Sequence, residues 1–332
     1  MRNILCVTLI ALLGGCTSTS VTEKYQDKRN DIINVKDKVI EFETGNVLIG
    51  SVSRLYMSNK CLLIADHKSV DKQIHIFNKN DFSYLTSIGN FGEGPEEITV
   101  MGCLAIDEAH HQLYVSDHAK QKIFSYDMDS VMVDSLYKPQ VKTAMNETLF
   151  PSEYQYINDT LSIAVLIKPT STSTFNQFLG RWNMNTGEII PMKYTHPDIQ
   201  KKRITFAASE KAGIYVECYT RHDLMTICSL DGELLYNIYG PDWDGGNGNK
   251  LQSFGTVMIG NDKIFVSYCG EDYARDSFPT KILVFDLEGN YLKTLETGYK
   301  ISDCCYDSFN NRIILSLNDV VQFAYLDIDG II

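Results

Sequence analysis

The 332-residue sequence has few prolines and tryptophans, no excess of positive charge and no long hydrophobic segment. It contains 8 Pro, 2 Trp and 30 basic residues against 42 acidic ones, so its formal net charge is −12. An acidic surface repels phosphate backbones, which excludes a broad nucleic-acid-binding face. The compact apolar run at residues 4–13 is too short for a membrane-spanning helix, which needs about 20 residues.

Motifs that carry catalytic or cofactor chemistry are missing as well. There is no Gly-x-Ser-x-Gly elbow, no His-Glu-x-x-His motif and no Asp-x-Asp-x-Asp-Gly calcium loop. The Gly-rich segment that begins at Gly89 does not match a dinucleotide-binding loop, because Pro95 and a further predicted strand follow it instead of a helix. We therefore predict no catalytic residue, no metal ligand and no cofactor.

Nine cysteines are present, but they do not form a disulfide pattern. After Cys6 and Cys16, which lie in or at the end of the leader, seven remain, and no two have Cys-x-x-Cys spacing. Most lie in apolar runs, so we expect buried free thiols. The vicinal pair Cys304 and Cys305 leaves a metal or redox site as the alternative.

The N-terminal segment has the pattern of a signal peptide: a basic start at Arg2, an apolar run, and then Leu13-Gly14-Gly15-Cys16. This ending resembles the lipobox of bacterial lipoproteins, and the resemblance implies that Cys16 is lipidated and becomes the mature N-terminus. An ordinary secretory signal is the alternative. We expect residues 1–15 to be the signal and residues 16–36 to be the lipidated cysteine and a polar tether. Thr17 is not an inner-membrane retention signal, which favours an outer-membrane anchor facing the periplasm, with the cell surface as the alternative.

An apolar run recurs six times along the mature chain, at intervals of 48 to 53 residues. The runs occupy residues 62–66, 113–117, 161–165, 214–218, 264–268 and 313–317. A second run and a polar turn follow each of them, and a short strand precedes each. Further strands are predicted after the turns, at residues 84–88, 131–136, 189–192, 234–238 and 291–295. Each unit therefore consists of four strands.

Six four-stranded units predict an all-β fold, a six-bladed β-propeller of antiparallel blades over residues 37–332. The last unit lacks its fourth strand, because the sequence stops at Ile332, just after the Asp329-Gly330 turn. The alternating segment Val39-Ile40-Glu41-Phe42 is predicted to supply that strand and close the ring.

Two segments carry a family resemblance. Residues 113–127 resemble an NHL-type propeller repeat, and the Gly-Pro-Glu linker at residues 89–97 is similar to that of TolB-like six-bladed propeller lipoproteins from Bacteroidetes. The resemblance implies the fold and says little about activity, since many members have no assigned reaction. Units three and five depart from the pattern, because they lack the strand-end Asp and carry long insertions.

The predicted loops differ in length between the two faces of the ring. Connections on one face, the long-loop face, are long and varied; those on the other, the short-loop face, are short. The long loops cover residues 89–99, 138–151, 168–177, 194–203, 240–253 and 269–280. Long loops on a rigid scaffold are where binding residues usually lie.

Candidate binding residues lie on the long-loop face. They are Trp243, Tyr273, Arg275, Arg221 and His222. The alternative is a tryptophan packed over a blade junction and solvated loops with local ion pairs.

Three further histidine sites could bind a metal, and two of them have a structural alternative. Asp66-His67 and Asp117-His118 suit a metal or a general base, or else each Asp accepts turn amides at a strand end. His110 lies on the opposite face, without a third ligand nearby in sequence.

These features predict a non-catalytic lipoprotein that is attached to the membrane through the lipid on Cys16. It would bind an unknown protein or glycan partner on the long-loop face. The alternative is a hydrolase or lyase with a metal-assisted site at the channel mouth.

Overall fold

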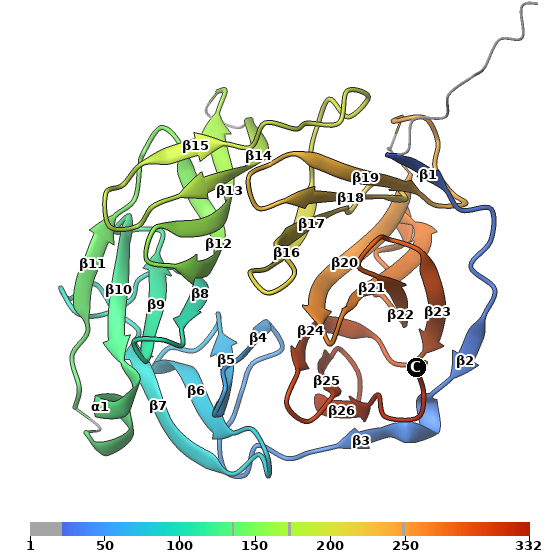
Figure 1. Cartoon of the computed structure of the whole chain (residues 1–332). Helices are drawn as coiled ribbons and strands as arrows, with labels where there is room; N and C mark the ends of the chain where they lie inside the picture. The colour runs from blue at the N-terminus through green and yellow to red at the C-terminus, as the bar shows by residue number, and fades with distance from the viewer. Residues whose placement is uncertain (1–21, 135, 172–173, 248–249) are drawn as a thin grey trace, which may run out of the picture.

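The computed structural model describes residues 22–134, 136–171, 174–247 and 250–332 of the chain. They form six sheets, each with four antiparallel strands, arranged as a ring around a central axis (Figure 1). The predicted six-bladed β-propeller is therefore confirmed. Cys16 lies outside the described residues.

Each blade contributes four strands from the axis to the rim. Blade 1 consists of β4 (Ser53–Met57), β5 (Cys61–Asp66), β6 (Lys72–Asn78) and β7 (Tyr84–Asn90). Blade 2 consists of β8 (Met101–Asp107), β9 (Gln112–Asp117), β10 (Lys122–Asp127) and β11 (Gln140–Ala144). Blade 3 consists of β12 (Phe150–Asn158), β13 (Leu161–Pro169), β14 (Phe175–Trp182) and β15 (Ile189–Pro191). Blade 4 consists of β16 (Ile204–Ser209), β17 (Ile214–Tyr219), β18 (Leu224–Ser229) and β19 (Leu234–Tyr239). Blade 5 consists of β20 (Leu251–Gly260), β21 (Lys263–Asp272), β22 (Lys281–Asp286) and β23 (Tyr291–Glu296). Blade 6 consists of β24 (Ile301–Asp307), β25 (Arg312–Leu317), β26 (Phe323–Asp327) and β3 (Val39–Glu41).

The second strand of each blade explains the repeat in the sequence. Neighbouring blades cover both of its faces, and in β5, β17 and β25 all six residues are buried. A strand buried on both faces reads as a continuous apolar run rather than as an alternating one. The six apolar runs in the sequence are therefore the second strands of the six blades.

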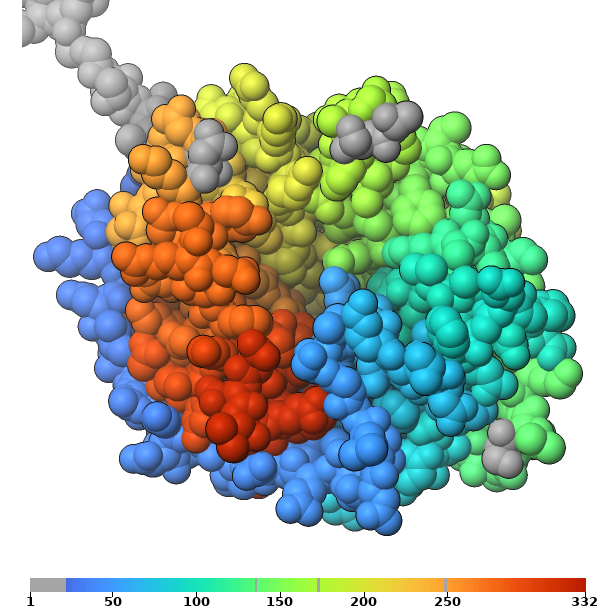
Figure 2. Space-filling view, turned by 180° about the vertical axis from the view of Figure 1, so that it is seen from behind, coloured from blue at the N-terminus to red at the C-terminus, as the bar shows by residue number. Residues whose placement is uncertain are grey.

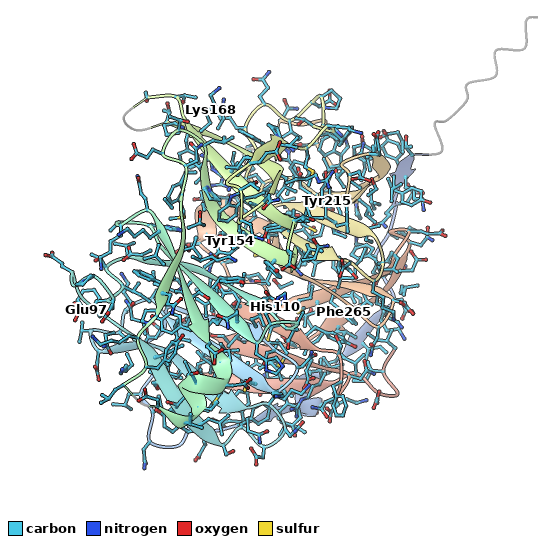
Figure 3. The ribbon with its side chains drawn as sticks, turned by 60° about the vertical axis from the view of Figure 1, so that its left-hand side comes forward. Glu97, His110, Tyr154, Lys168, Tyr215 and Phe265 are labelled. Carbon is cyan, nitrogen blue, oxygen red and sulfur yellow. The ribbon has the colours of Figure 1, made fainter. Side chains whose placement is uncertain are left out.

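The hydrophobic core is divided among the six junctions between blades, with one cluster of buried side chains at each. Figure 3 labels Tyr154, Tyr215 and Phe265, which belong to three of these clusters. The seven cysteines of the described chain are free and buried, as predicted. Burial raises the pKa of the Cys304 and Cys305 thiols, which disfavours the thiolate that metal or redox chemistry requires.

The ring is closed by an N-terminal strand, as the sequence predicted. β3 pairs antiparallel with β26, with Val39 opposite Leu326 and Glu41 opposite Ala324. The ring of Phe42 then stacks on Phe82 of blade 1, with 3.9 Å between the ring centroids. Closure therefore joins the first and last blades through both backbone pairing and aromatic packing.

The outer part of blade 2 differs from the prediction. The strand expected at residues 131–136 is replaced by the helix α1 (Met128–Val133), and β11 forms the fourth strand. The Asp127 side chain caps the helix by accepting a hydrogen bond from the Ser130 amide, and Val131 is buried. An N-cap aspartate favours a helical turn over continuation of a strand.

The described part of the predicted tether is packed on the propeller. Residues 22–36, here called the rim strap, contain β1 (Glu23–Tyr25) and β2 (Ile32–Asn34), and the 3₁₀ turn η1 (Lys36–Lys38) follows. β1 pairs in parallel with β19, and β2 pairs in parallel with β23. Blades 4 and 5 therefore have five strands each. The sequence did not predict this pairing, because the segment is polar and its two short strands show no alternation of apolar and polar residues.

Replacement of Phe42 should weaken ring closure. We expect Phe42→Ala to lower the free energy of unfolding by about 2–3 kcal/mol, because it removes a half-buried ring from the junction of blades 6 and 1. Leu48→Ala is the control, since Leu48 is 94% exposed a few residues further on. Urea unfolding curves of both variants measure the difference. Equal stability of the two variants would contradict this account of closure.

Candidate functional site

The six innermost strands surround a channel on the axis of the ring. These strands, β4, β8, β12, β16, β20 and β24, line a cavity of about 1630 Å³. Figure 2 shows the molecule hollowed near the centre of one face, between blade 1 in blue and blade 5 in orange. Side chains from every blade converge on this space, which makes the channel a candidate ligand site.

Charged and polar side chains line the channel. The Arg54 guanidinium of β4 forms an ion pair with the Glu153 carboxylate of β12 at 3.0 Å and so links blade 1 to blade 3. These side chains are 46% and 39% exposed, because the channel around them is open. The Asp303 carboxylate of β24 accepts hydrogen bonds from the Thr256 hydroxyl at 2.7 Å and the Leu55 amide at 2.8 Å. Burial raises the pKa of Asp303. Sequence reasoning missed this set.

Four polar residues occupy equivalent positions at the mouth of the channel on the long-loop face. In each of four blades, the residue after the second strand donates its backbone N–H to a carbonyl that precedes the first strand. The pairs are His67 with Val52, His118 with Val100, Thr220 with Arg203, and Asn318 with Lys300, at 2.8–3.1 Å. All four donor residues line the cavity, so the repeat places equivalent residues of four blades around it.

The aspartates before the two histidines accept backbone hydrogen bonds. The Asp66 carboxylate accepts from the Gly50 amide at 2.7 Å, and the Asp117 carboxylate accepts from the Thr99 amide at 2.8 Å. The strand-end interpretation of both aspartates is therefore confirmed.

His118 is held in place by two neighbours. Its ring makes an edge contact with Phe150, with 4.8 Å between the ring centroids. A Cβ atom at Gly102 would clash with the His118 ring, so only glycine fits there. Burial, and to a smaller extent the positive charge of Arg54, lowers the pKa of both His118 and His67. Both imidazoles are therefore neutral at pH 7.

Aromatic side chains complete the mouth of the channel. Phe91, Phe175 and Phe278 line it, and Phe91 and Phe175 are 45% and 38% exposed. The Arg203 guanidinium lies 4.5 Å from the centroid of the Phe175 ring. Exposed aromatic rings beside a guanidinium are typical of binding surfaces.

The five predicted binding residues lie outside the channel, in loops of blades 4 and 5, and none lines the cavity. Trp243 is partly buried and contacts the rings of His196, Tyr239 and His222, with 5.0–5.9 Å between centroids. His222 is buried. Both residues therefore lie in loops and pack against blade 4.

The other three predicted residues form a group next to them, in which Arg221 is partly buried and Tyr273 and Arg275 are exposed. The Arg221 guanidinium lies 3.0 Å from the centroid of the Tyr273 ring, which belongs to the 3₁₀ turn η2 (Tyr273–Arg275). Arg275 pairs with Glu271 at 2.9 Å, and the Arg275 side chain is 69% exposed. The stack of Arg221 on Tyr273 connects a loop of blade 4 to a loop of blade 5.

On the short-loop face, three potential metal ligands lie close together, two from a turn of blade 2 and one from a turn of blade 3. Side-chain atoms of Asp107, His110 and Asp159 lie within 4.8 Å of one another. Asp159 was missed because it comes from the next blade. Blade 6 has the same turn, in which Asp307 accepts from the amide and side chain of Asn310 as Asp107 does from His110. The hydrogen bonding between Asp107 and His110 is therefore a feature of the repeat. The hydrogen bond to Asp107 raises the pKa of His110.

The blades and channel define a six-bladed β-propeller. Residues 17–174 match the sequence model of a family, DUF5128, that is described as a six-bladed β-propeller. No curated protein matches the chain. In the described part of the chain, no helix is long and apolar enough to cross a membrane.

Solved structures share the fold at low identity. A protein from Bacteroides fragilis described as exported has a TM-score of 0.57 and 13% identity, over 89% of this chain and 87% of that chain. A member of the DUF4221 family from Bacteroides vulgatus has a TM-score of 0.56 and 10% identity, over 87% and 94%. A luciferin-regenerating enzyme has a TM-score of 0.57 and 8% identity, over 86% and 94%. These likenesses concern the fold alone.

Acidification should destabilise the protein through its buried and partly buried histidines. Burial lowers the pKa of five of the seven histidines, which are His67, His75, His118, His196 and His222. The unfolded chain takes up these protons near pH 6.5 while the folded protein resists them, so the free energy of unfolding falls below that pH. We expect the melting temperature to fall between about pH 7.5 and 5.5, and to fall less in His118→Gln.

His111→Gln is the control, because His111 is an exposed histidine on the short-loop face. This variant should keep the full drop in scanning calorimetry. A drop in His118→Gln as large as that of the parent would show that His118 is not held neutral by burial.

Proposed function

We propose that the chain is an extracytoplasmic lipoprotein, anchored in the outer membrane through Cys16 and facing the periplasm, that binds a protein or glycan partner without catalysis. The binding surface is the long-loop face over blades 4 and 5. The observation that carries the proposal is the stack of Arg221 on the exposed Tyr273 ring, which joins two blades beside Trp243 and the open channel.

The anchor rests on the sequence. Leu13-Gly14-Gly15-Cys16 resembles a lipobox, and the apolar run before it is too short to span a bilayer. The Bacteroides fragilis protein of the same fold is described as exported, which supports an extracytoplasmic location. The resemblance of residues 89–97 to the linker of TolB-like propeller lipoproteins supports the same assignment.

Removal of the modified thiol should release the protein from membranes. We expect Cys16→Ser to shift the protein from the membrane pellet to the soluble fraction, because stable attachment depends on the acyl chains that the cysteine carries. Fractionation after a high-salt wash measures this. The buried Cys61→Ser variant is the control and should stay in the pellet. Retention of Cys16→Ser in the washed pellet would contradict the anchor.

The long-loop face has the composition of a binding surface. Arginine and aromatic residues dominate binding hot spots, because they combine large contact area with directed hydrogen bonds. Tyr273 is 49% exposed, and the Arg275 side chain is 69% exposed next to it. The blades hold these loops in a fixed relative position, so the loops lose little conformational entropy when a partner binds.

Substitution of this group should weaken partner capture. Lipidated protein serves as bait on detergent extracts of the native membrane, and recovered proteins and glycans are quantified by mass spectrometry. We expect Tyr273→Ala and Arg275→Ala each to weaken capture by more than about 1 kcal/mol, which is about fivefold. Tyr84→Ala is the matched control, because Tyr84 on blade 1 is 46% exposed.

The alternative function, a hydrolase or lyase acting at the channel mouth, is favoured by one observation. His67 and His118 are neutral imidazoles beside Arg54 in an open cavity. If His67→Gln and His118→Gln abolish capture while Tyr273→Ala does not, the partner site lies in the channel and the proposed face is wrong.

A further inference from the structure

The rim strap fixes the chain to the outer edge of the propeller immediately after the proposed lipid anchor. Figure 1 shows it in blue along the rim, from β1 beside blade 4 to β2 beside blade 5. In β1, Glu23 lies opposite Asn237; in β2, Ile32 lies opposite Thr294. The strap therefore covers the edges of two sheets before β3 closes the ring.

Glu23 and Tyr25 attach the strap to blade 4. The Glu23 carboxylate accepts hydrogen bonds from the Asn237 amide group and the Tyr239 hydroxyl. The Tyr25 ring stacks on the Tyr239 ring at 4.5 Å between centroids, with an interplanar angle of 13°. These contacts add side-chain interactions to the backbone pairing of a three-residue strand, which would be too short to hold by itself.

A buried ion pair attaches the strap between blades 4 and 5. Arg29 and Asp223 are 2.7 Å apart, and their side chains are only 7% and 0% exposed. The Arg29 guanidinium also lies 5.5–5.7 Å from the centroids of three aromatic rings of blade 5, those of Phe254, Tyr268 and Phe285. Detaching the strap would leave Asp223 buried without its partner, which is strongly unfavourable.

The short distance along the chain from Cys16 to Glu23 limits where a lipid on Cys16 can lie. These seven residues reach at most about 25 Å when fully extended. A compact domain of this size is roughly 50 Å across. A lipid on Cys16 therefore keeps the rim of blade 4 close to the bilayer. Blade 1 lies across the ring from blade 4 in Figure 1, so the protein cannot contact the bilayer through blade 1 with blade 4 pointing away from it.

The surface of the strap suits an anionic lipid surface better than the rest of the protein does. Residues 22–36 contain four basic and three acidic residues, and because Arg29 is buried against Asp223 the remaining charges of the strap cancel, whereas the chain as a whole has a net charge of −12. Tyr25 and Ile32 are 69% and 53% exposed on the strap. Tyrosine favours the headgroup region of a bilayer, and an acidic protein lying flat on one face would be repelled.

We propose that the rim strap is the membrane-facing surface of the protein, so that the propeller stands on the rim of blade 4 against the lipid headgroups and both channel mouths face the aqueous compartment. This inference rests on the proposed lipidation of Cys16. It explains how a short anchor leaves the long-loop face open to a partner, because that face then lies at an angle to the bilayer instead of against it.

Single-cysteine labelling tests this orientation. The seven cysteines of the described chain are buried, so a fluorophore reacts selectively with an added exposed cysteine. Glu233→Cys lies just before β19 in blade 4, and Ser83→Cys occupies the equivalent place just before β7 in blade 1. Full-length lipidated protein is inserted into phosphatidylethanolamine–phosphatidylglycerol vesicles that carry an acceptor dye on the headgroups.

We expect energy transfer to the headgroups to be several-fold stronger from position 233 than from position 83. A flexible insert of about 20 Gly and Ser residues between residues 21 and 22 adds roughly 25 Å of mean reach and should remove most of this difference. Equal transfer from the two positions in the protein without the insert overturns the orientation. Protein that does not float with the vesicles instead contradicts the lipidation of Cys16, and the orientation with it.

Discussion

Closure of the ring by β3 is the constraint on which the rest of the structure depends. A blade has two edges, and an exposed outer strand presents unpaired backbone groups that invite aggregation. β26 receives β3 from the N-terminal part of the chain, so blade 6 is completed by residues about 280 positions earlier in sequence. Every core cluster lies between two blades, and Phe42, which follows β3, packs against the cluster at the junction of blades 6 and 1. The channel, whose lining comes from all six blades, depends on the same closure.

Much of the fold could be predicted, because the repeat is driven by burial. The second strand of each blade is covered on both faces and needs an apolar run, and such runs are visible in one sequence. The closing strand was predictable from its alternation and from the strand missing in the last unit. The pairing of β1 and β2 was not, because Glu23 and Arg29 are polar residues whose partners, Asn237, Tyr239 and Asp223, lie some 200 residues away. The helix α1 was missed because its N-cap Asp127 also fits the strand-end pattern of the repeat.

The loop residues of the candidate site could be predicted from the sequence, and the residues that line the channel could not. Trp243 and Tyr273 belong to loops that the sequence marks as long, whereas Arg221, which stacks on Tyr273, lies in the short turn between β17 and β18. The charged channel residues Arg54, Glu153 and Asp303 come from three blades, and only the closed ring brings them together. Their sequence signal is their place in the first strand of a unit, which faces the axis. His67 and His118 were recognised as an equivalent pair, but their role at the channel mouth follows from the ring and not from the Asp-His dipeptide.

Hydrogen exchange along residues 22–42 tests most directly whether the N-terminal segment is a structural part of the propeller. The amides of Gln26, Val35 and Phe42 donate to carbonyls of Tyr239, Glu296 and Phe323 in blades 4, 5 and 6. If the segment is held as described, these three amides exchange as slowly as amides in the outer strands of the blades, and they lose protection together with blade 6 when denaturant is added. Exchange of all three at the rate of an unstructured chain, with the blades still protected, would contradict both the rim strap and the closure of the ring.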